Sequence, residues 1–132
     1  MMPEKSLSIT QIERDGENGS GLASVPHDPT DTPIDGASHP KAYTGYSDST
    51  GQFTAGVWAC DAGTLEVKNL PFDELCFVID GEVEVTDDQG VSLTFNEGDA
   101  FLLHRGFTGT WRMPRPFRKF NGIFTAIGEK QK

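Results

Sequence analysis

Short runs of alternating apolar and polar residues, separated by Gly, Asp or Asn, fill the chain from Phe53 onward. In Glu82–Val85 and again in Val91–Phe95 every second residue is apolar, which is the period of a strand with one buried face. The stretch Asp87–Gly90 supplies turn residues between them, so the pair predicts a β-hairpin. No window has the 3.6-residue apolar period of an amphipathic helix. The alternation therefore restricts this part of the chain to an all-β domain.

Six further short runs have the alternating, β-branched and aromatic composition of strands. They are Phe53–Cys60, Thr64–Lys68, Glu74–Ile79, Ala100–Leu103, Gly109–Met113 and Phe117–Ile127. With the hairpin they make about eight short strands at close spacing, which is typical of a β-sandwich or jelly-roll barrel. The length of 132 residues is enough for one such domain and an additional arm.

The region before the barrel has a different composition. Residues 15–40 are rich in Gly, Ser, Pro, Asp and Thr, and four prolines interrupt them. We expect an irregular N-terminal arm over residues 1–41, a barrel domain over 42–128 and a tail over 129–132. Near the start of the arm, the β-prone residues Leu7, Ile9 and Ile12 predict a possible edge strand, on this barrel or on a neighbouring copy.

The formal net charge is −9, from 11 Lys and Arg against 20 Asp and Glu. Binding to nucleic acid or to an anionic membrane surface depends on clustered Lys and Arg, so the charge argues against both partners. No stretch approaches the roughly 18 apolar residues of a membrane-spanning helix, and the first ten residues lack the apolar core of a signal peptide. Cys60 and Cys76, with no CxxC pair, predict reduced thiols, and we expect a cytoplasmic location.

Two glycine-anchored blocks flank the predicted hairpin. Glu74 is followed by six residues and Gly81, and Gly98 is followed by five residues and then His104-Arg105-Gly106. This order and spacing resemble the two motifs of the cupin superfamily, with His104 in a slot where the family pattern has proline. Further matches resemble its ethanolamine-utilisation-type branch, also called DUF861 or cupin_3: Gly56–Cys60, Asp73-Glu74, Gly81-Glu82, Gly98–Ala100, Gly106–Trp111 and Arg118–Phe120. The resemblance spans residues 42–127 and implies a cupin double-stranded β-helix, usually a homodimer, with a pocket inside the barrel.

The resemblance also locates the usual metal ligands of a cupin, and here this chain departs from the pattern. The two histidine positions of the first motif fall on Lys68 and Leu70, on Val67 and Asn69, or on Asn69 and Pro71. In the second motif, Gly109 and Met113 stand where the pattern has His and Asn. Only Glu74 of the usual set remains, whereas a transition metal usually needs three or four ligands. We therefore predict neither a metal site nor another cofactor.

Glu74 is the candidate catalytic residue. It begins an apolar run, Leu75–Ile79, which places its carboxylate at a dry barrel mouth, where it would suit a general acid or base. The structural alternative is a carboxylate that pairs with an arginine across the sheet, because glutamate is seldom buried without a partner.

Charge is segregated along the barrel. Residues 69–103 contain nine Asp and Glu and no Lys or Arg, whereas residues 104–128 contain Arg and Lys but no Asp or Glu. The structural interpretation is cross-strand ion pairing between the two blocks. The functional interpretation is that Arg112, Arg118 or Lys119 binds a ligand carboxylate or phosphate. Strand alternation puts Arg118 and Lys119 on opposite faces, so only one of them can line the pocket.

Four aromatic residues complete the candidate ligand-binding set: Trp58, Phe77, Phe101 and Trp111. They either line a pocket for a planar or sugar-like ligand or simply pack in the hydrophobic core. His104 is interpreted as an exposed turn residue, with proton transfer or incidental metal binding as the alternatives.

The sequence leaves three functions open. The first is a metal-independent cupin that binds a small anionic or polyol-like metabolite, with acid-base chemistry at Glu74 as a possible extension. The second is a non-catalytic dimeric binding or regulatory module in which the arm reaches a partner subunit. The third is a metalloenzyme with an unusual ligand set drawn from Glu74, His104 and an arm histidine.

Overall fold

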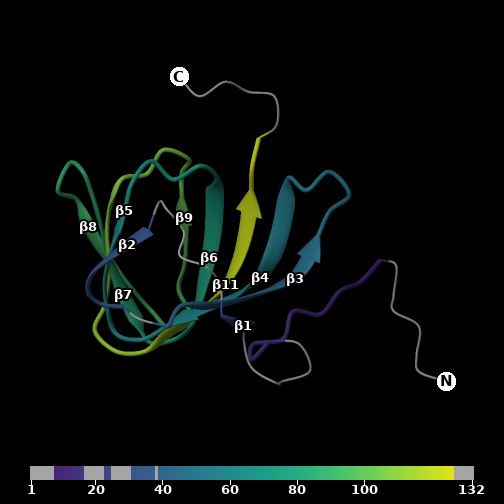
Figure 1. Ribbon diagram of the computed structural model, residues 1–132, viewed down its shortest axis with the longest axis horizontal. Helices are drawn as coiled ribbons and strands as arrows, with labels where there is room; N and C mark the ends of the chain where they lie inside the picture. The colour runs from purple at the N-terminus through teal and green to yellow at the C-terminus, as the bar shows by residue number, and fades with distance from the viewer. Residues whose placement is uncertain (1–7, 17–22, 25–30, 38, 127–132) are drawn as a thin grey trace.

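The computed structural model describes residues 8–16, 23–24, 31–37 and 39–126. Within these residues the chain forms eleven strands in two antiparallel sheets and no helix. Sheet A has the order β1 (Ala23–Ser24), β3 (Lys41–Ser47), β4 (Phe53–Cys60), β11 (Phe117–Phe124), β6 (Asp73–Asp80) and β9 (Ala100–Leu103). Sheet B has the order β2 (Asp31–Gly36), β5 (Gly63–Val67), β10 (Gly109–Met113), β7 (Glu82–Asp87) and β8 (Ser92–Asn96). The two sheets curve around a shared interior, as Figure 1 shows, which is the jelly-roll barrel that the alternation predicts.

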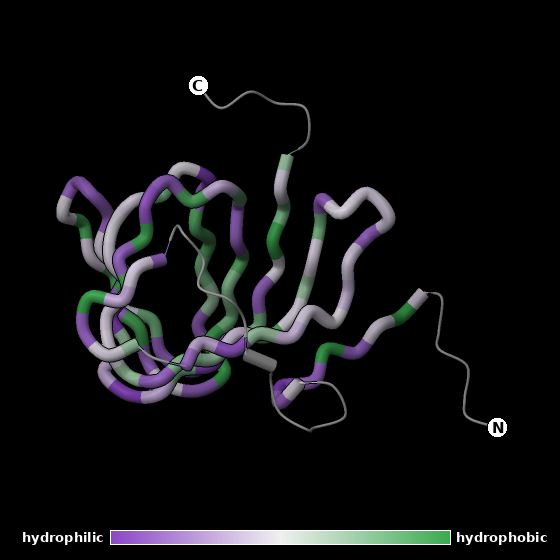
Figure 2. Tube along the Cα trace, in the orientation of Figure 1, coloured by the Kyte–Doolittle hydropathy of each residue, from purple (hydrophilic) through white to green (hydrophobic). Residues whose placement is uncertain are grey.

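The predicted strands of the barrel are confirmed as β4 to β11, with small shifts at their ends. The hairpin of β7 and β8 is also confirmed, with Val83 opposite Phe95 and Val85 opposite Leu93. Figure 2 shows apolar and polar positions alternating along these strands. Among the described residues there is no helix long and apolar enough to cross a membrane.

Residues 31–37 of the predicted arm are built into the barrel. Strand β2 pairs with β5, and Ala37 after it is 1% exposed in the core. Sequence reasoning missed β2 because it contains Pro33, which is tolerated there since β2 is the edge strand of sheet B. The strand predicted around Leu7, Ile9 and Ile12 is absent from residues 9–13, while Leu7 lies outside the described residues.

The core lies between the sheets and consists of inward-facing residues of both. The most deeply buried side chains include Cys76 and Val78 of sheet A and Val83 and Met113 of sheet B. Trp111 of β10 also belongs to this core, at 3% exposure. The interior is therefore apolar on nearly all sides, and any charged group in it needs a partner.

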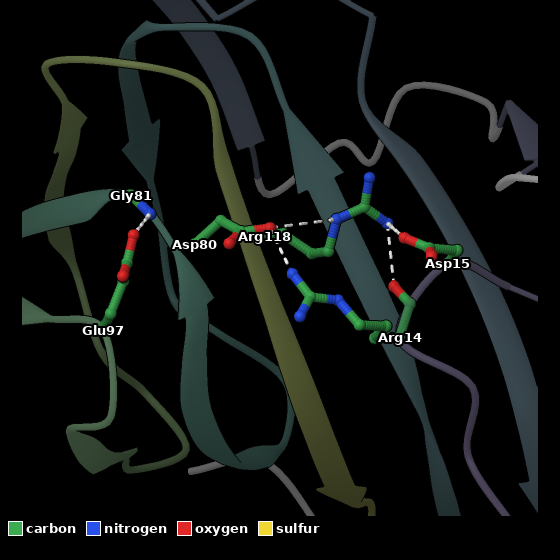
Figure 3. Close-up of polar contacts among 6 residues, drawn as sticks. All are labelled: Arg14, Asp15, Asp80, Gly81, Glu97 and Arg118. Carbon is green, nitrogen blue, oxygen red and sulfur yellow. Dashed lines mark hydrogen bonds and ion pairs between the residues drawn. The ribbon is translucent and has the colours of Figure 1, made fainter.

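Gly81 joins the two sheets at the turn between β6 and β7. Its φ of +91° lies in the left-handed region that favours glycine, and a Cβ atom there would come within 2.5 Å of the Pro116 carbonyl oxygen. Its N–H donates to Glu97 Oε2 at 3.2 Å (Figure 3). The glycine that ends the first cupin-like block is therefore required by the backbone geometry of this turn.

Candidate functional site

A cavity of about 290 Å³ opens between the sheets. Its walls come from β4, β5, β6, β10 and β11, and residues of the 31–44 segment also line it. Most of the lining is apolar, and its polar groups converge at Glu74, Lys119 and Asn121. A mostly apolar pocket with a few convergent polar groups is the usual form of a small-molecule site.

Glu74 and Lys119 form a buried ion pair in this cavity. The Lys119 Nζ atom lies 2.6 Å from Glu74 Oε2, and the two side chains are only 6% and 9% exposed. Asn121 Nδ2 donates to the same oxygen at 3.2 Å, and Lys119 also donates to Cys76 Sγ at 3.5 Å. Glu74 Oε1 makes no hydrogen bond with any of the described residues. The carboxylate is thus held by one oxygen and leaves the other for a ligand.

Strands β6 and β11 bring these groups together because they are neighbours in sheet A. Their register puts Asn121 opposite Cys76 and Lys119 opposite Val78, with a register shift between Arg118 and Lys119. Side chains alternate along β11, so Lys119 and Asn121 point inward together. The predicted alternation is confirmed: Lys119 faces the interior, and Arg118 faces the outside of the sheet.

Two tryptophan rings enclose the ammonium group. The Lys119 Nζ atom lies 4.4 Å from the ring centroid of Trp111 and 5.1 Å from that of Trp58, which is the distance range of cation–π attraction. Burial alone lowers the pKa of Lys119, but its interactions with Cys76 and Glu74 outweigh this effect, so the pKa rises above its usual value. At neutral pH the cation in the cavity is therefore a permanently charged lysine.

The structure brings together four of the sequence-predicted site residues. Glu74, Trp58, Trp111 and Lys119 all line the cavity. Phe101 packs behind it, with its ring stacked on Phe95 at 4.0 Å and tilted against Trp111 at 5.7 Å.

The other three predicted residues lie outside the cavity. Phe77 is 44% exposed and packs against Phe120. Arg112 pairs with Glu84, with its side chain 58% exposed, and Arg118 faces the arm. A ligand in the cavity would not contact these three residues.

The predicted pairing between the acidic and basic blocks is confirmed. Four of the basic side chains meet acidic residues of β6 and β7, in the pairs Lys119–Glu74, Arg118–Asp80, Arg112–Glu84 and Arg115–Glu82. Glu74 thus has a partner, as the structural alternative expects, but that partner is a lysine and not an arginine. Three of the four pairs are partly solvent-exposed and keep much of their hydration. Only the buried Glu74–Lys119 pair therefore carries a large desolvation cost.

Arg118 connects the N-terminal arm to the barrel (Figure 3). Its Nη1 atom donates to the Arg14 carbonyl oxygen at 2.8 Å and lies 3.7 Å from Asp15 Oδ1. Arg14 in turn pairs with Asp80 at 2.8 Å, and Arg118 Nε lies 3.8 Å from the same carboxylate. The arm segment 8–16 is therefore held by a network of charges at the surface of sheet A.

Replacing Arg118 by Ala is expected to release this segment with little loss of global stability. Partly exposed ion pairs contribute about 1 kcal/mol or less each, so the free energy of unfolding should fall by about 1 kcal/mol. Limited proteolysis should cut Arg118→Ala near residues 8–16 faster than the wild type. Arg112→Ala, which also removes a surface ion pair, is the control and should be cut at the wild-type rate. Equal cleavage rates for Arg118→Ala and Arg112→Ala would contradict the role of this charge network in holding segment 8–16 on sheet A.

Both cysteines are buried and have weakly acidic thiols. Burial raises the pKa of Cys60 to about 11 and that of Cys76 to about 12. Since the thiolate is the reactive form, we expect neither residue to react with an alkylating reagent at neutral pH in the native protein. Mass spectrometry should find both labelled only after unfolding. Rapid labelling of Cys76 in the native protein would contradict this burial.

The described residues of the cavity do not provide the donor set that a cupin metal needs. No group of three or more His, Cys, Asp and Glu side chains gathers in the described part of the chain. Glu74 faces the ammonium of Lys119 at 2.6 Å, so a positive charge already stands where a metal ion would bind this carboxylate. His104 is exposed on the turn after β9, and His27 lies outside the described residues. We derive no chemistry through a metal at this site.

Asn121 is the polar residue of the candidate site that the sequence analysis did not single out. The alternation along β11 placed it on the same face as Lys119, which was the available signal. The contact of Cys76 with Lys119 could not be read from the chain, because it depends on the register between β6 and β11.

An antiparallel jelly roll with a cavity between its two sheets is the architecture of a small cupin. More particularly, the chain belongs to the EutQ-like cupin domain family, whose model matches residues 47–120. The comparison with curated proteins gives no match.

Solved structures show the same fold. The EutQ protein of Clostridium difficile is 18% identical, with 67% of this chain and 69% of that chain covered and a TM-score of 0.58. A putative ethanolamine utilization protein Q of Salmonella typhimurium is 19% identical, with 90% and 99% covered and a TM-score of 0.59. A DUF861 family protein of unknown function from Pseudomonas syringae is 27% identical over 76% of this chain and 42% of that chain, with a TM-score of 0.61.

Proposed function

We propose that this cupin binds a small, uncharged, hydroxyl-bearing metabolite of the polyol type in its barrel cavity. The observation that carries the proposal is the 2.6 Å contact between Lys119 and Glu74, which neutralises the only lysine that lines the cavity among the described residues. Glu74 Oε1 remains as an acceptor for a ligand hydroxyl, and the Asn121 amide offers both a donor and an acceptor. Hydroxyl groups donate and accept, so they match this mixed set.

The charge of the cavity favours a neutral ligand over an anion. An anionic ligand would need a cation that is not already paired, but Arg112 and Arg118 both lie outside the cavity. Asp31 adds a further acidic side chain to the lining. An incoming carboxylate would therefore lose its hydration without gaining an unpaired positive charge.

The indole rings supply the apolar part of the recognition. Trp58 and Trp111 line the cavity next to Lys119, with their rings in an edge-to-face arrangement 6.1 Å apart. Such surfaces pack against the C–H face of a polyol or sugar while its hydroxyls reach the polar end. Glu74 and Asn121 then set the orientation of the bound molecule.

Matched pairs of compounds test this function. Ribitol and ribonate, like glycerol and glycerate, differ in charge and share every hydroxyl except the terminal one that the carboxylate replaces. A ligand of the native state raises the melting temperature, by the equivalent of about 2.7 kcal/mol at 100 times its Kd. We expect at least one polyol to raise Tm more than its paired carboxylate. A larger rise with the carboxylates, or no rise with any polyol of a broader panel, would contradict the proposal.

A further inference from the structure

The two sheets leave a groove between their edge strands β8 and β9. Each strand is the last of its sheet, and β8 lies at the outer margin of the barrel (Figure 1). The groove has a volume of about 610 Å³, and its lining comes from β7, β8, β9 and the loops beside them. Val91, Leu93 and Leu102 line it and are 49–59% exposed. This β8–β9 groove thus exposes several large apolar side chains at one place, which is typical of an interaction site.

The composition of β8 and β9 suits them to pairing with a further strand. Native sheets protect exposed edges with charged side chains or proline, because unpaired backbone groups otherwise attract other strands. Strand β2, at the opposite edge of sheet B, has both kinds of protection, with Asp31, Pro33 and Asp35. Strands β8 and β9 read SLTFN and AFLL, without a charge or a proline. No described strand covers their outer edges.

The outer edge of β8 presents backbone groups at defined residues. At the end of the strand, Asn96 N–H donates to Asp99 Oδ2 at 2.8 Å, and the Asn96 carbonyl oxygen accepts the Asp99 N–H at 2.9 Å. Backbone groups of successive residues point to alternate edges of a strand, so Thr94 and Ser92 face the same edge as Asn96. The 2.6 Å contact between Thr86 Oγ1 and Ser92 Oγ agrees with this, because side chains are closest in the non-hydrogen-bonded pairs of a ladder. Thr94 and Ser92 can therefore bind the backbone of an added strand.

The charge around the groove points to a basic occupant. Asp87 and Asp88 line it, whereas no Lys or Arg of the described residues does, and its remaining ionisable side chain is His104. Asp87 Oδ1 accepts backbone N–H groups of its own turn, and neither carboxylate forms an ion pair with a described residue. With a net charge of −9, the chain attracts cationic segments and repels a second copy of itself.

We propose that the β8–β9 groove binds an extended segment of a partner protein, in which apolar residues alternate with lysine or arginine, as an added strand on β8. Such pairing gains affinity from main-chain hydrogen bonds and specificity from pockets for alternate side chains. The side chains of an added strand alternate as those of β8 do, where Leu93 and Phe95 line the groove and Thr94 does not. The apolar residues of the segment therefore enter the groove, and its basic residues face solvent, where the negative charge of the barrel attracts them.

Fluorescence anisotropy of the full chain with a fluorescein-labelled peptide, KVKVKVK, tests this surface. We expect saturable binding that weakens as salt is added, because part of the attraction is electrostatic. The peptide EVEVEVE reverses the charge, and KVKPKVK keeps the charge but has a central proline that cannot complete the strand pairing. Both should bind at least about tenfold more weakly than KVKVKVK. No saturable binding of KVKVKVK up to about 1 mM protein, or equal binding of KVKPKVK, would overturn the proposal.

Matched variants test whether the peptide lies in the groove. Leu93→Lys puts a cation into it, and Thr94→Pro removes a backbone N–H from the free edge, so each should weaken binding of KVKVKVK at least about tenfold. Ile34→Lys is the control, because Ile34 is 58% exposed on β2, against 59% for Leu93, and the substitution changes the net charge equally. Ile34→Lys should bind as the wild type does. A loss in Ile34→Lys equal to that in Leu93→Lys would mean that the peptide senses only the overall charge, and would overturn the proposal.

Two further measurements keep the result unambiguous. Leu93 is exposed and proline is tolerated on edge strands, so both variants should keep the wild-type circular dichroism spectrum. If Thr94→Pro loses the fold, Leu93→Lys decides alone. In analytical ultracentrifugation Leu93→Lys should have the same mass as the wild type. A fall in mass would assign the groove to a second copy of the chain and would overturn the proposal.

Discussion

Replacing Lys119 by Met should lower the free energy of unfolding by about 3–5 kcal/mol, because it leaves the carboxylate of Glu74 buried without its counter-charge. The pair is 2.6 Å long and both side chains are less than 10% exposed, so the carboxylate is largely removed from bulk solvent and depends on the ammonium for its stabilisation. The loss of cation–π contacts to Trp58 and Trp111 adds to the effect. Chemical denaturation of the wild type and of Lys119→Met measures the difference in their free energies of unfolding.

Two further variants distinguish the loss of the buried ion pair from the stability change that any Lys→Met substitution causes. Lys68→Met removes an exposed lysine that lies 3.9 Å from Glu66, and should change the stability by about 0.5 kcal/mol or less. The double variant Glu74→Leu with Lys119→Met replaces the whole pair by apolar groups and should be more stable than Lys119→Met alone. A Lys119→Met protein as stable as Lys68→Met would contradict the buried ion pair.

The pH dependence of this contribution has a definite sign. The pKa of Lys119 is raised above its ordinary value of 10.5, so the folded state holds the proton more tightly than the unfolded state. Its contribution is fully present below 10.5 and is lost as the pH rises through the raised pKa. The deficit of Lys119→Met relative to the wild type should therefore not shrink between about pH 7 and about pH 9.

Replacing Asn121 by Leu should weaken binding of the polyol by about 10-fold to 100-fold, as expected for losing a hydrogen bond in a buried site. Asn121 lines the cavity and donates to Glu74 Oε2, and leucine has a similar size without the amide. The ion pair stays in place, so the fold should be retained. Isothermal titration with the polyol that raises Tm most measures the change in Kd.

Ile123→Val is the matched control for this variant. Ile123 lines the same cavity from the same strand but offers no polar group, so its loss of one methylene should change Kd by only a few-fold. Unchanged binding by Asn121→Leu would mean that the polyol does not contact the polar end of the cavity.

The barrel was predictable from the sequence because its signals are local. Val83, Val85, Leu93 and Phe95 alternate with polar residues, and the turn residues between them fix the hairpin without information from the rest of the chain. Strand β2 was not predictable in the same way, since Pro33 and its neighbours have the composition of a loop. It is held in the sheet by its pairing with β5, which is a long-range interaction.

The sequence predicted several residues of the candidate site, but not Asn121 and not the pairing between Glu74 and Lys119. The spacing to Gly81 identified Glu74 as a candidate site residue. The alternation along β11 predicted that Lys119 and Arg118 point to opposite faces of the sheet. Which of the two faces the interior depends on how β11 packs between β4 and β6. Phe77 of β6 and Arg112 of β10 lie on outer surfaces, although residue type alone made them candidates for the pocket.

The most direct test of the central claim is a titration of the protein with a polyol, followed by the two indole N–H signals in NMR spectra. The chain has only two tryptophans, Trp58 and Trp111, and both line the cavity. Trp58→Phe assigns the two signals. We predict that both signals shift in a saturable way with ribitol or the best polyol of the panel, and that they shift much less in Asn121→Leu. Binding detected by calorimetry that leaves both indole signals unmoved would contradict a ligand site in this cavity.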